Sequence, residues 1–195
     1  MDSDDIHLLL RMHDGDGAAA DLVWRRHAPS LRAYARSIVR EDSAAEDVVQ
    51  RVFCRVLELP KARLRAIDAA RPWLAAAVRN EAIRHLRGEG RERRRRDNAA
   101  KAGALRSVPQ PAEAHWRTPD SIEAALESLP RRSREALVLR HIAGLNFDQM
   151  AAALGLPRST VASRYTAAVA LIRAAMTPRP LGTPRKSPEE VRHAC

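Results

Sequence analysis

The chain is short of cysteines, aromatic residues and long apolar runs, and each shortage argues against a class of protein. Cys54 and Cys195 are the only cysteines, which is too few for a disulfide framework and favours a reducing compartment. No apolar stretch approaches the roughly 20 residues that cross a bilayer. Acidic residues interrupt residues 1–21, where a signal peptide would need an apolar core. We therefore expect a soluble, cytoplasmic protein.

Motifs that carry catalysis or bind nucleotides are also missing. Seven histidines are scattered along the chain, and there is no His-Glu-x-x-His, Cys-x-x-Cys, phosphate-binding Gly-rich loop or Gly-x-Ser-x-Gly. The run Gly88-Glu89-Gly90 follows no predicted strand, so it is not a nucleotide motif. We expect no catalytic residue, no metal and no cofactor, and a protein that acts by directing another enzyme.

The charge that is present is strongly positive and unevenly placed. Lys and Arg number 34 against 24 Asp and Glu, which gives a net charge of +10. Residues 1–83 are neutral, with 13 basic and 13 acidic side chains, whereas residues 84–106 carry nine basic and three acidic ones. A basic excess in the middle and C-terminal half is the pattern that a polyanionic partner favours.

The most informative segment, residues 129–173, reads as a helix-turn-helix. Gly144 suits the position after a helix C-terminus, and Asn146 with Gln149 forms a capping box. The short helix 147–154 stops at Gly155, and Pro157 suits the entry to the next helix. That helix has one apolar stripe, formed by Val161, Tyr165, Ala168 and Ile172.

The opposite side of this last helix carries hydroxyl and guanidinium groups close to its start. In a recognition helix such groups contact bases and phosphates in the major groove. The alternative is an ordinary helical hairpin with a polar face. The DNA-binding interpretation assigns the contacts to Arg158, Ser159, Thr160, Ser163 and Arg164.

The remainder predicts an all-α chain of two small helical domains joined by a basic flexible linker. A strong apolar face runs through a helix that opens near Ser43 and ends before Pro60, and another helix restarts at Arg71-Pro72-Trp73. We see no alternating strand pattern and no internal repeat. The predicted division is an N-terminal domain at 1–87, a linker at 88–118, a helix-turn-helix domain at 119–176 and a disordered tail at 177–195.

Two sets of residues resemble the extracytoplasmic-function sigma factors of bacterial RNA polymerase, in the sigma-70 family. The first is SAAEDVVQRVFCRVLEL at 43–59 followed by RPWLAAAVRNEAIRHLR at 71–87. The second is ALESLPRRSREALVLRHIAGLNFDQMAAALGLPRSTVASRYTAAVALIR at 125–173. Each motif is moderately specific by itself, and both in this order across a linker are strongly specific. The resemblance covers most of residues 18–174.

The resemblance implies that the first domain docks on the clamp helices of the polymerase. The matching positions are Glu46, Asp47, Gln50 and Arg51. Arg51 departs from the acid that the family usually has there. Without the family, the same residues read as a solvated helix face whose acids lie near the helix N-terminus, where the macrodipole favours them.

The same resemblance places promoter opening on the following loop and helix. Residues 60–70 would form a pocket for an extruded base, and Trp73 reads as a core anchor rather than a stacking residue. Aromatic residues make up only 4% of the chain, which favours opening only promoters of close sequence match. The residues implied at the −10 element are Arg79, Asn80, Arg84 and Arg87, with Asn80 the best candidate for a base contact.

The helix-turn-helix would then read the −35 element, although Ala162 stands where the family often has lysine. The implied partners are bacterial core RNA polymerase and promoter DNA, with an anti-sigma factor as a further candidate. For the arginine run at 93–96, a solvated spacer and a phosphate-neutralising linker both remain open. The alternative function is a stand-alone helix-turn-helix regulator that binds operator DNA without core polymerase.

Overall fold

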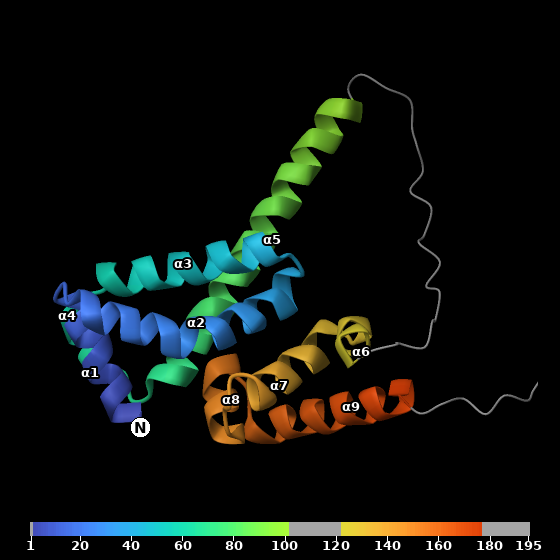
Figure 1. The fold of residues 1–195 in the computed structure, drawn as a ribbon. Helices are drawn as coiled ribbons and strands as arrows, with labels where there is room; N and C mark the ends of the chain where they lie inside the picture. The colour runs from blue at the N-terminus through green and yellow to red at the C-terminus, as the bar shows by residue number, and fades with distance from the viewer. Residues whose placement is uncertain (1, 102–121, 177–195) are drawn as a thin grey trace, which may run out of the picture.

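The computed structural model describes residues 2–101 and 122–176 (Figure 1). Within these residues the secondary structure is entirely helical, which confirms the predicted all-α class. The N-terminal half contains α1 (Asp2–His13), α2 (Gly17–Val39), α3 (Asp42–Glu58), α4 (Lys61–Arg65) and α5 (Ala70–Lys101). The C-terminal half contains α6 (Ile122–Ser128), α7 (Arg131–His141), α8 (Phe147–Leu154) and α9 (Arg158–Met176). The predicted tail at 177–195 lies outside the described residues.

The N-terminal half is a bundle in which α2, α3 and α5 pack on one another. Asp16 starts α2, because its Oδ1 accepts a hydrogen bond from the Ala19 amide at 3.0 Å. The predicted apolar face of α3 is buried, with Val48 and Val56 wholly inaccessible. As expected, α3 begins near Ser43 and ends before Pro60.

The segment predicted as a loop at residues 60–70 contains the short helix α4. Leu64 and Ile67 are buried in the bundle core, and α4 packs on α1. The apolar residues in this stretch are too few to show a period, so the helix was not visible in the sequence. Whether the segment receives an extruded base stays a prediction.

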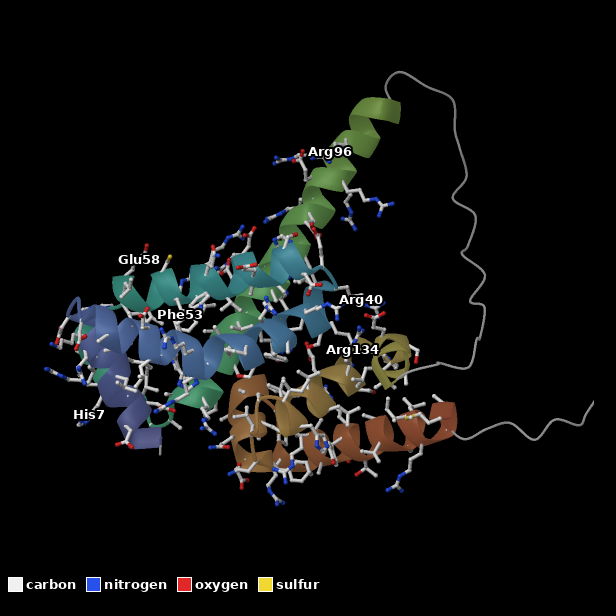
Figure 2. All side chains as sticks on the ribbon, in the orientation of Figure 1. His7, Arg40, Phe53, Glu58, Arg96 and Arg134 are labelled. Carbon is white, nitrogen blue, oxygen red and sulfur yellow. The ribbon has the colours of Figure 1, made fainter. Side chains whose placement is uncertain are left out.

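Helix α5 starts one residue before the expected restart and runs much farther than the sequence suggested. The boundary predicted at Gly88 is not a helix end, since α5 continues to Lys101. Contacts one turn apart support the continuation, between His85 Nε2 and Glu89 Oε1 at 3.4 Å and in the ion pair of Glu92 and Arg96 at 3.3 Å. The last turns project beyond the bundle, where Figure 2 shows Arg96. Residues 102–118 of the predicted linker lie outside the described residues.

The C-terminal half packs against the N-terminal half through α7 on α2 and α8 on α5. Leu139, Leu145 and Met150, which are almost fully buried, belong to the same apolar core as the bundle residues. A smaller cluster of Leu129, Leu137 and Ala168 holds α9 to α7. The two predicted domains therefore share one continuous core in this arrangement.

Among the helices described here, none combines the length and the apolar character that crossing a lipid bilayer requires.

Candidate nucleic-acid interface

The turn before the candidate recognition helix is fixed by hydrogen bonds at both ends of α8. The Gln149 amide donates to Asn146 Oδ1 at 2.8 Å, and the Asn146 amide donates to Gln149 Oε1 at 3.0 Å. Gly144 and Gly155 adopt φ angles of +67° and +63°, a conformation that glycine reaches without steric cost. The predicted capping box and the predicted stop at Gly155 are confirmed. Helix α7 already ends at His141, with Ile142 as its C-cap, so Gly144 belongs to the following turn and not to the predicted position directly after the helix.

Helix α9 is held by the apolar stripe that its sequence predicted. Val161 and Ala168 are completely buried, and Tyr165 and Ile172 are half-buried. The Tyr165 hydroxyl lies 3.0 Å from His141 Nε2, and its ring meets the Phe147 ring edge-on at 5.5 Å between centroids. These contacts orient α9 rigidly against α7 and α8, so its polar side has a defined direction.

The predicted recognition residues gather at the start of α9. Arg158, Ser159 and Ser163 are exposed, while Thr160 and Arg164 are half-buried. Arg158 Nε lies 3.1 Å from Asp148 Oδ1, and its guanidinium lies 5.9 Å from the centre of the Phe147 ring. Guanidinium and hydroxyl donors of this kind suit phosphate oxygens and the guanine edge in the major groove.

Three of the four residues predicted at the −10 element share one exposed side of α5. Asn80, Arg84 and Arg87 are exposed and follow one another at helical spacing. Arg79 is different, because its side chain is only 24% exposed and its Nε lies 4.0 Å from Glu135 Oε2 on α7. The structure thus directs Arg79 toward the helix-turn-helix half and leaves the other three at the surface.

Glu135 is a buried acid between the two halves, and sequence reasoning missed it. It is 1% exposed, and its Oε1 lies 3.9 Å from Arg131 Nε. Burial raises the pKa of Glu135, and the nearby Arg79 and Arg131 oppose that shift. The neighbouring Tyr34 is also buried, and burial together with Glu135 raises the pKa of its hydroxyl.

The predicted polymerase-docking residues on α3 are all exposed, but they lie on two sides of the helix. Glu46 lines a pocket of about 400 Å³ beside α2, and Gln50 lines a shallow groove of about 790 Å³. Asp47 and Arg51 belong to the other side, where Arg51 pairs with Glu81 of α5. The four residues are therefore not a single face.

The groove beside Gln50 has an apolar floor that the sequence did not reveal. It is lined by Trp24, Phe53 and Leu57. The Trp24 and Phe53 rings lie 5.0 Å apart, and both Trp24 and Leu57 keep a large exposed area. Exposed apolar area that polar residues surround is typical of a protein-binding surface. In the sequence Trp24 is followed by two arginines. A tryptophan beside charged residues was the one signal that could have indicated an exposed apolar site.

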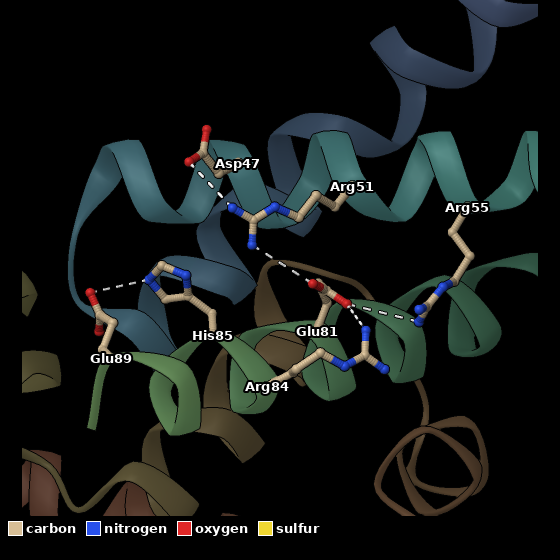
Figure 3. Close-up of polar contacts among 7 residues, drawn as sticks. All are labelled: Asp47, Arg51, Arg55, Glu81, Arg84, His85 and Glu89. Atoms are coloured by element: carbon tan, nitrogen blue, oxygen red, sulfur yellow. Dashed lines mark hydrogen bonds and ion pairs between the residues drawn. The ribbon is translucent and has the colours of Figure 1, made fainter. Parts of the chain in front are cut away.

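A cluster of charged side chains joins α3 to α5 on the side away from that groove (Figure 3). The buried carboxylate of Glu81 receives Arg84 from its own helix and both Arg51 and Arg55 from α3. Neither Glu81 nor Arg55 was identified from the sequence. Among the described residues, no group of three or more His, Cys, Asp or Glu side chains is arranged to hold a metal ion.

Comparisons of the sequence with known protein families and proteins agree with one another. Residues 23–92 match the family model of Sigma-70 region 2, and residues 120–172 match that of Sigma-70, region 4. The RNA polymerase sigma factor CarQ of Myxococcus xanthus is 31% identical over 151 residues, which cover 75% of this chain and 82% of CarQ. The ECF RNA polymerase sigma factor EcfG of Rhodopseudomonas palustris is 31% identical over 147 residues, covering 72% and 75%.

Two solved structures have the same fold. CnrH, in complex with the cytosolic domain of CnrY, aligns with a TM-score of 0.56 and 25% identity over 87% of this chain and 95% of CnrH. The sigma factor RpoE of Bartonella quintana, in complex with the anti-sigma factor NepR, aligns with a TM-score of 0.59 and 24% identity. That alignment covers 82% of this chain and 98% of RpoE.

Proposed function

This chain belongs to the extracytoplasmic-function sigma factors of the sigma-70 family, and we propose that it acts through the surfaces described above. It is an alternative sigma factor, which binds core RNA polymerase and directs promoter recognition, DNA opening and the start of transcription. Sigma factors are non-catalytic DNA-recognition subunits, so the chemistry belongs to the polymerase. Its proposed place of action is the cytoplasm, together with that enzyme.

The proposal also assigns a function to each part of the chain. We assign residues 1–87 to core polymerase and the −10 element, and residues 119–176 to the −35 element, with 88–118 as the connection. The observation that carries the assignment is the capped helix-turn-helix, whose buried stripe leaves Arg158, Ser159 and Ser163 exposed at the start of α9. Thr160 and Arg164 complete the recognition set.

At the −10 element, Asn80 is the proposed base contact, and Arg84 and Arg87 are the proposed backbone contacts. An asparagine side chain can donate to and accept from the edge of adenine in a bidentate pair, whereas arginines neutralise phosphates. Arg79 joins this set only when it is released from Glu135, since the two lie 4.0 Å apart in the described arrangement.

For polymerase docking we propose α3, with Glu46, Asp47 and Gln50 as contacts and the groove of Trp24, Phe53 and Leu57 as the apolar part. Such a surface combines an apolar centre with a polar rim, as protein interfaces do. An anti-sigma factor is also proposed as a partner, because RpoE and CnrH, which share this fold, were each solved with a bound partner.

The direct test is co-elution of the purified protein with bacterial core RNA polymerase, beside the variants Glu46→Arg and Asp68→Arg. Both substitutions reverse one exposed charge, but only Glu46 lies beside the proposed docking groove. We expect the wild type and Asp68→Arg to co-elute with the core, and Glu46→Arg to bind at least tenfold more weakly. A wild type that binds duplex DNA but not the core would instead support the stand-alone regulator.

A further inference from the structure

We propose that Arg51, Arg55 and Arg84 form one binding site for the phosphate backbone of promoter DNA, and that Glu81 positions them. The proposal rests on the proposed function and deepens it. It moves Arg51 from the polymerase-docking face to the DNA-binding face and adds Arg55, which neither the sequence nor the family resemblance had assigned.

The geometry is the first argument (Figure 3). Arg51 Nη1 lies 3.8 Å from Glu81 Oε1, and Arg55 Nη1 lies 3.8 Å from Glu81 Oε2. Arg84 also pairs with Glu81 Oε2. Two neighbouring helices thus bring three guanidinium groups to a single carboxylate, which fixes them relative to one another.

The balance of charge and exposure is the second argument. Glu81 is buried, whereas the side chains of Arg51, Arg55 and Arg84 are 52%, 52% and 54% exposed. A guanidinium has five N–H donors, so one carboxylate satisfies only part of the three groups. The remaining donors of these half-exposed guanidinium groups can therefore bind an external oxyanion.

Asp47 is the other acid that faces the cluster, at 3.8 Å from Arg51. The positive charge still exceeds the negative, with three arginines against two carboxylates. His85 lies next to the cluster, and its Nε2 lies 3.4 Å from Glu89 Oε1 one turn along α5 (Figure 3). An external oxyanion would therefore meet free donors and net positive charge, as a phosphate group requires.

Helix α5 extends the site into a line, which is the third argument. Because α5 is continuous to Lys101, the exposed Arg84, Arg87, Arg91 and Arg95 follow one another at spacings of three and four residues on one side. Residues 84–96 hold seven arginines and two glutamates. At 1.5 Å per residue the line is roughly 16 Å long, which matches about five phosphates of one DNA strand along the duplex axis.

The position of the docking groove is the fourth argument. Gln50 and Glu46 lie beside α2, on the opposite side of α3 from Arg51 and Arg55. A polymerase bound at the groove leaves Arg55 and Arg84 uncovered, and Asp47, which pairs with Arg51, lies at the border between the two surfaces. The cluster shares Arg84 with the proposed −10 surface and lies one turn of α5 from Asn80, so DNA is the proposed occupant.

The test measures two affinities for each variant, one for core polymerase and one for holoenzyme on promoter DNA at several salt concentrations. The variants are Arg51→Ala, Arg55→Ala and the double substitution, with Arg173→Ala as control. Arg173 is an exposed arginine in the last turn of α9, far along that helix from the recognition residues at its start. We expect unchanged core affinity throughout, promoter affinity several-fold lower in each single variant, and a smaller salt dependence. The slope of log affinity against log salt falls by roughly 0.9 for each phosphate that the variant no longer neutralises.

Glu81→Gln separates positioning from net charge. The substitution removes a negative charge, so a simple field effect would raise promoter affinity, whereas the loss of positioning lowers it. We expect a decrease, with the thermal melt checked by circular dichroism. The proposal is overturned if the arginine variants bind promoter DNA like Arg173→Ala, or if they lose core affinity instead. Wild-type protein that fails to bind the core would overturn the proposed function, and the inference with it.

Discussion

At the scale of single residues, Arg164 is the sharpest test of the recognition helix. It lies half-buried near the start of α9, and a bidentate arginine contact to a base contributes about 1–3 kcal/mol. We expect Arg164→Ala to weaken holoenzyme binding to a cognate promoter about 5- to 150-fold without lowering the thermal melting temperature.

The conservative variant Arg164→Lys distinguishes two modes of contact. Lysine keeps the charge but lacks the planar fork, so it restores a phosphate contact and not a bidentate base contact. Promoter affinity unchanged in Arg164→Ala, at physiological salt, would contradict the assigned role.

Glu135 gives the second prediction at this scale, and it concerns pH. Its folded pKa is raised above the ordinary value of 4.5 by burial, so the folded protein holds this proton more tightly than the unfolded chain. The stability that it contributes is fully present below pH 4.5 and is lost as the pH rises through the folded pKa. We expect Glu135→Gln to become progressively more stable than wild type as the pH rises through the folded pKa of Glu135.

The measurement is the difference in melting temperature between wild type and Glu135→Gln across a pH series. Glu58→Gln is the matched control, because Glu58 is an exposed acid at the end of α3. A difference that does not depend on pH, or one that favours wild type at the higher pH, would contradict the role of burial.

Residue-level outcomes also show what the sequence can predict. The capping box of Asn146 and Gln149 was predictable because both partners lie within four residues of each other. The direction of Arg79 was not, because its partner Glu135 lies on α7, in the other half of the chain. The polymerase-docking set was predicted as one face, but the structure divides it, because Arg51 pairs with a carboxylate from α5.

At the scale of single helices, the bounds predicted from the sequence were accurate where the local sequence signals were strong. The bounds of α8 were predicted correctly, since a side-chain cap starts it and Gly155 ends it. The length of α5 was underestimated, because Gly88 and Gly90 each cost a helix about 1 kcal/mol and read as linker residues. Pairs one turn apart, such as Glu92 with Arg96, favour continuation of the helix.

The cap of α8 gives a prediction for this scale. Replacing a side-chain N-cap by alanine costs about 1 kcal/mol, which corresponds to a fall of about 2–4 °C in the melting temperature of a protein of this size. We expect this fall for Asn146→Ala, measured by calorimetry. Asn146→Asp keeps the acceptor oxygen and should melt near the wild-type temperature, so equal destabilisation by both variants would argue against the cap as the cause.

At the scale of the whole molecule, the two halves contact each other more closely than two domains on a flexible linker would suggest. Helices α7 and α8 pack on α2 and α5, and the apolar core continues from one half into the other. The sequence shows apolar faces on each helix, but it does not show which faces meet across the linker. The contact bears on the proposed DNA site, because it directs Arg79, a proposed −10 residue, toward Glu135 of α7.

The central claim is that this chain gives core RNA polymerase its promoter specificity. The most direct measurement is transcription by purified bacterial core polymerase from a library of genomic fragments, with and without the protein, with every transcript start mapped. The account predicts new starts that appear only with the protein and share a two-part upstream sequence. It is contradicted if the protein adds no start to those of the core alone while the same preparation still binds duplex DNA.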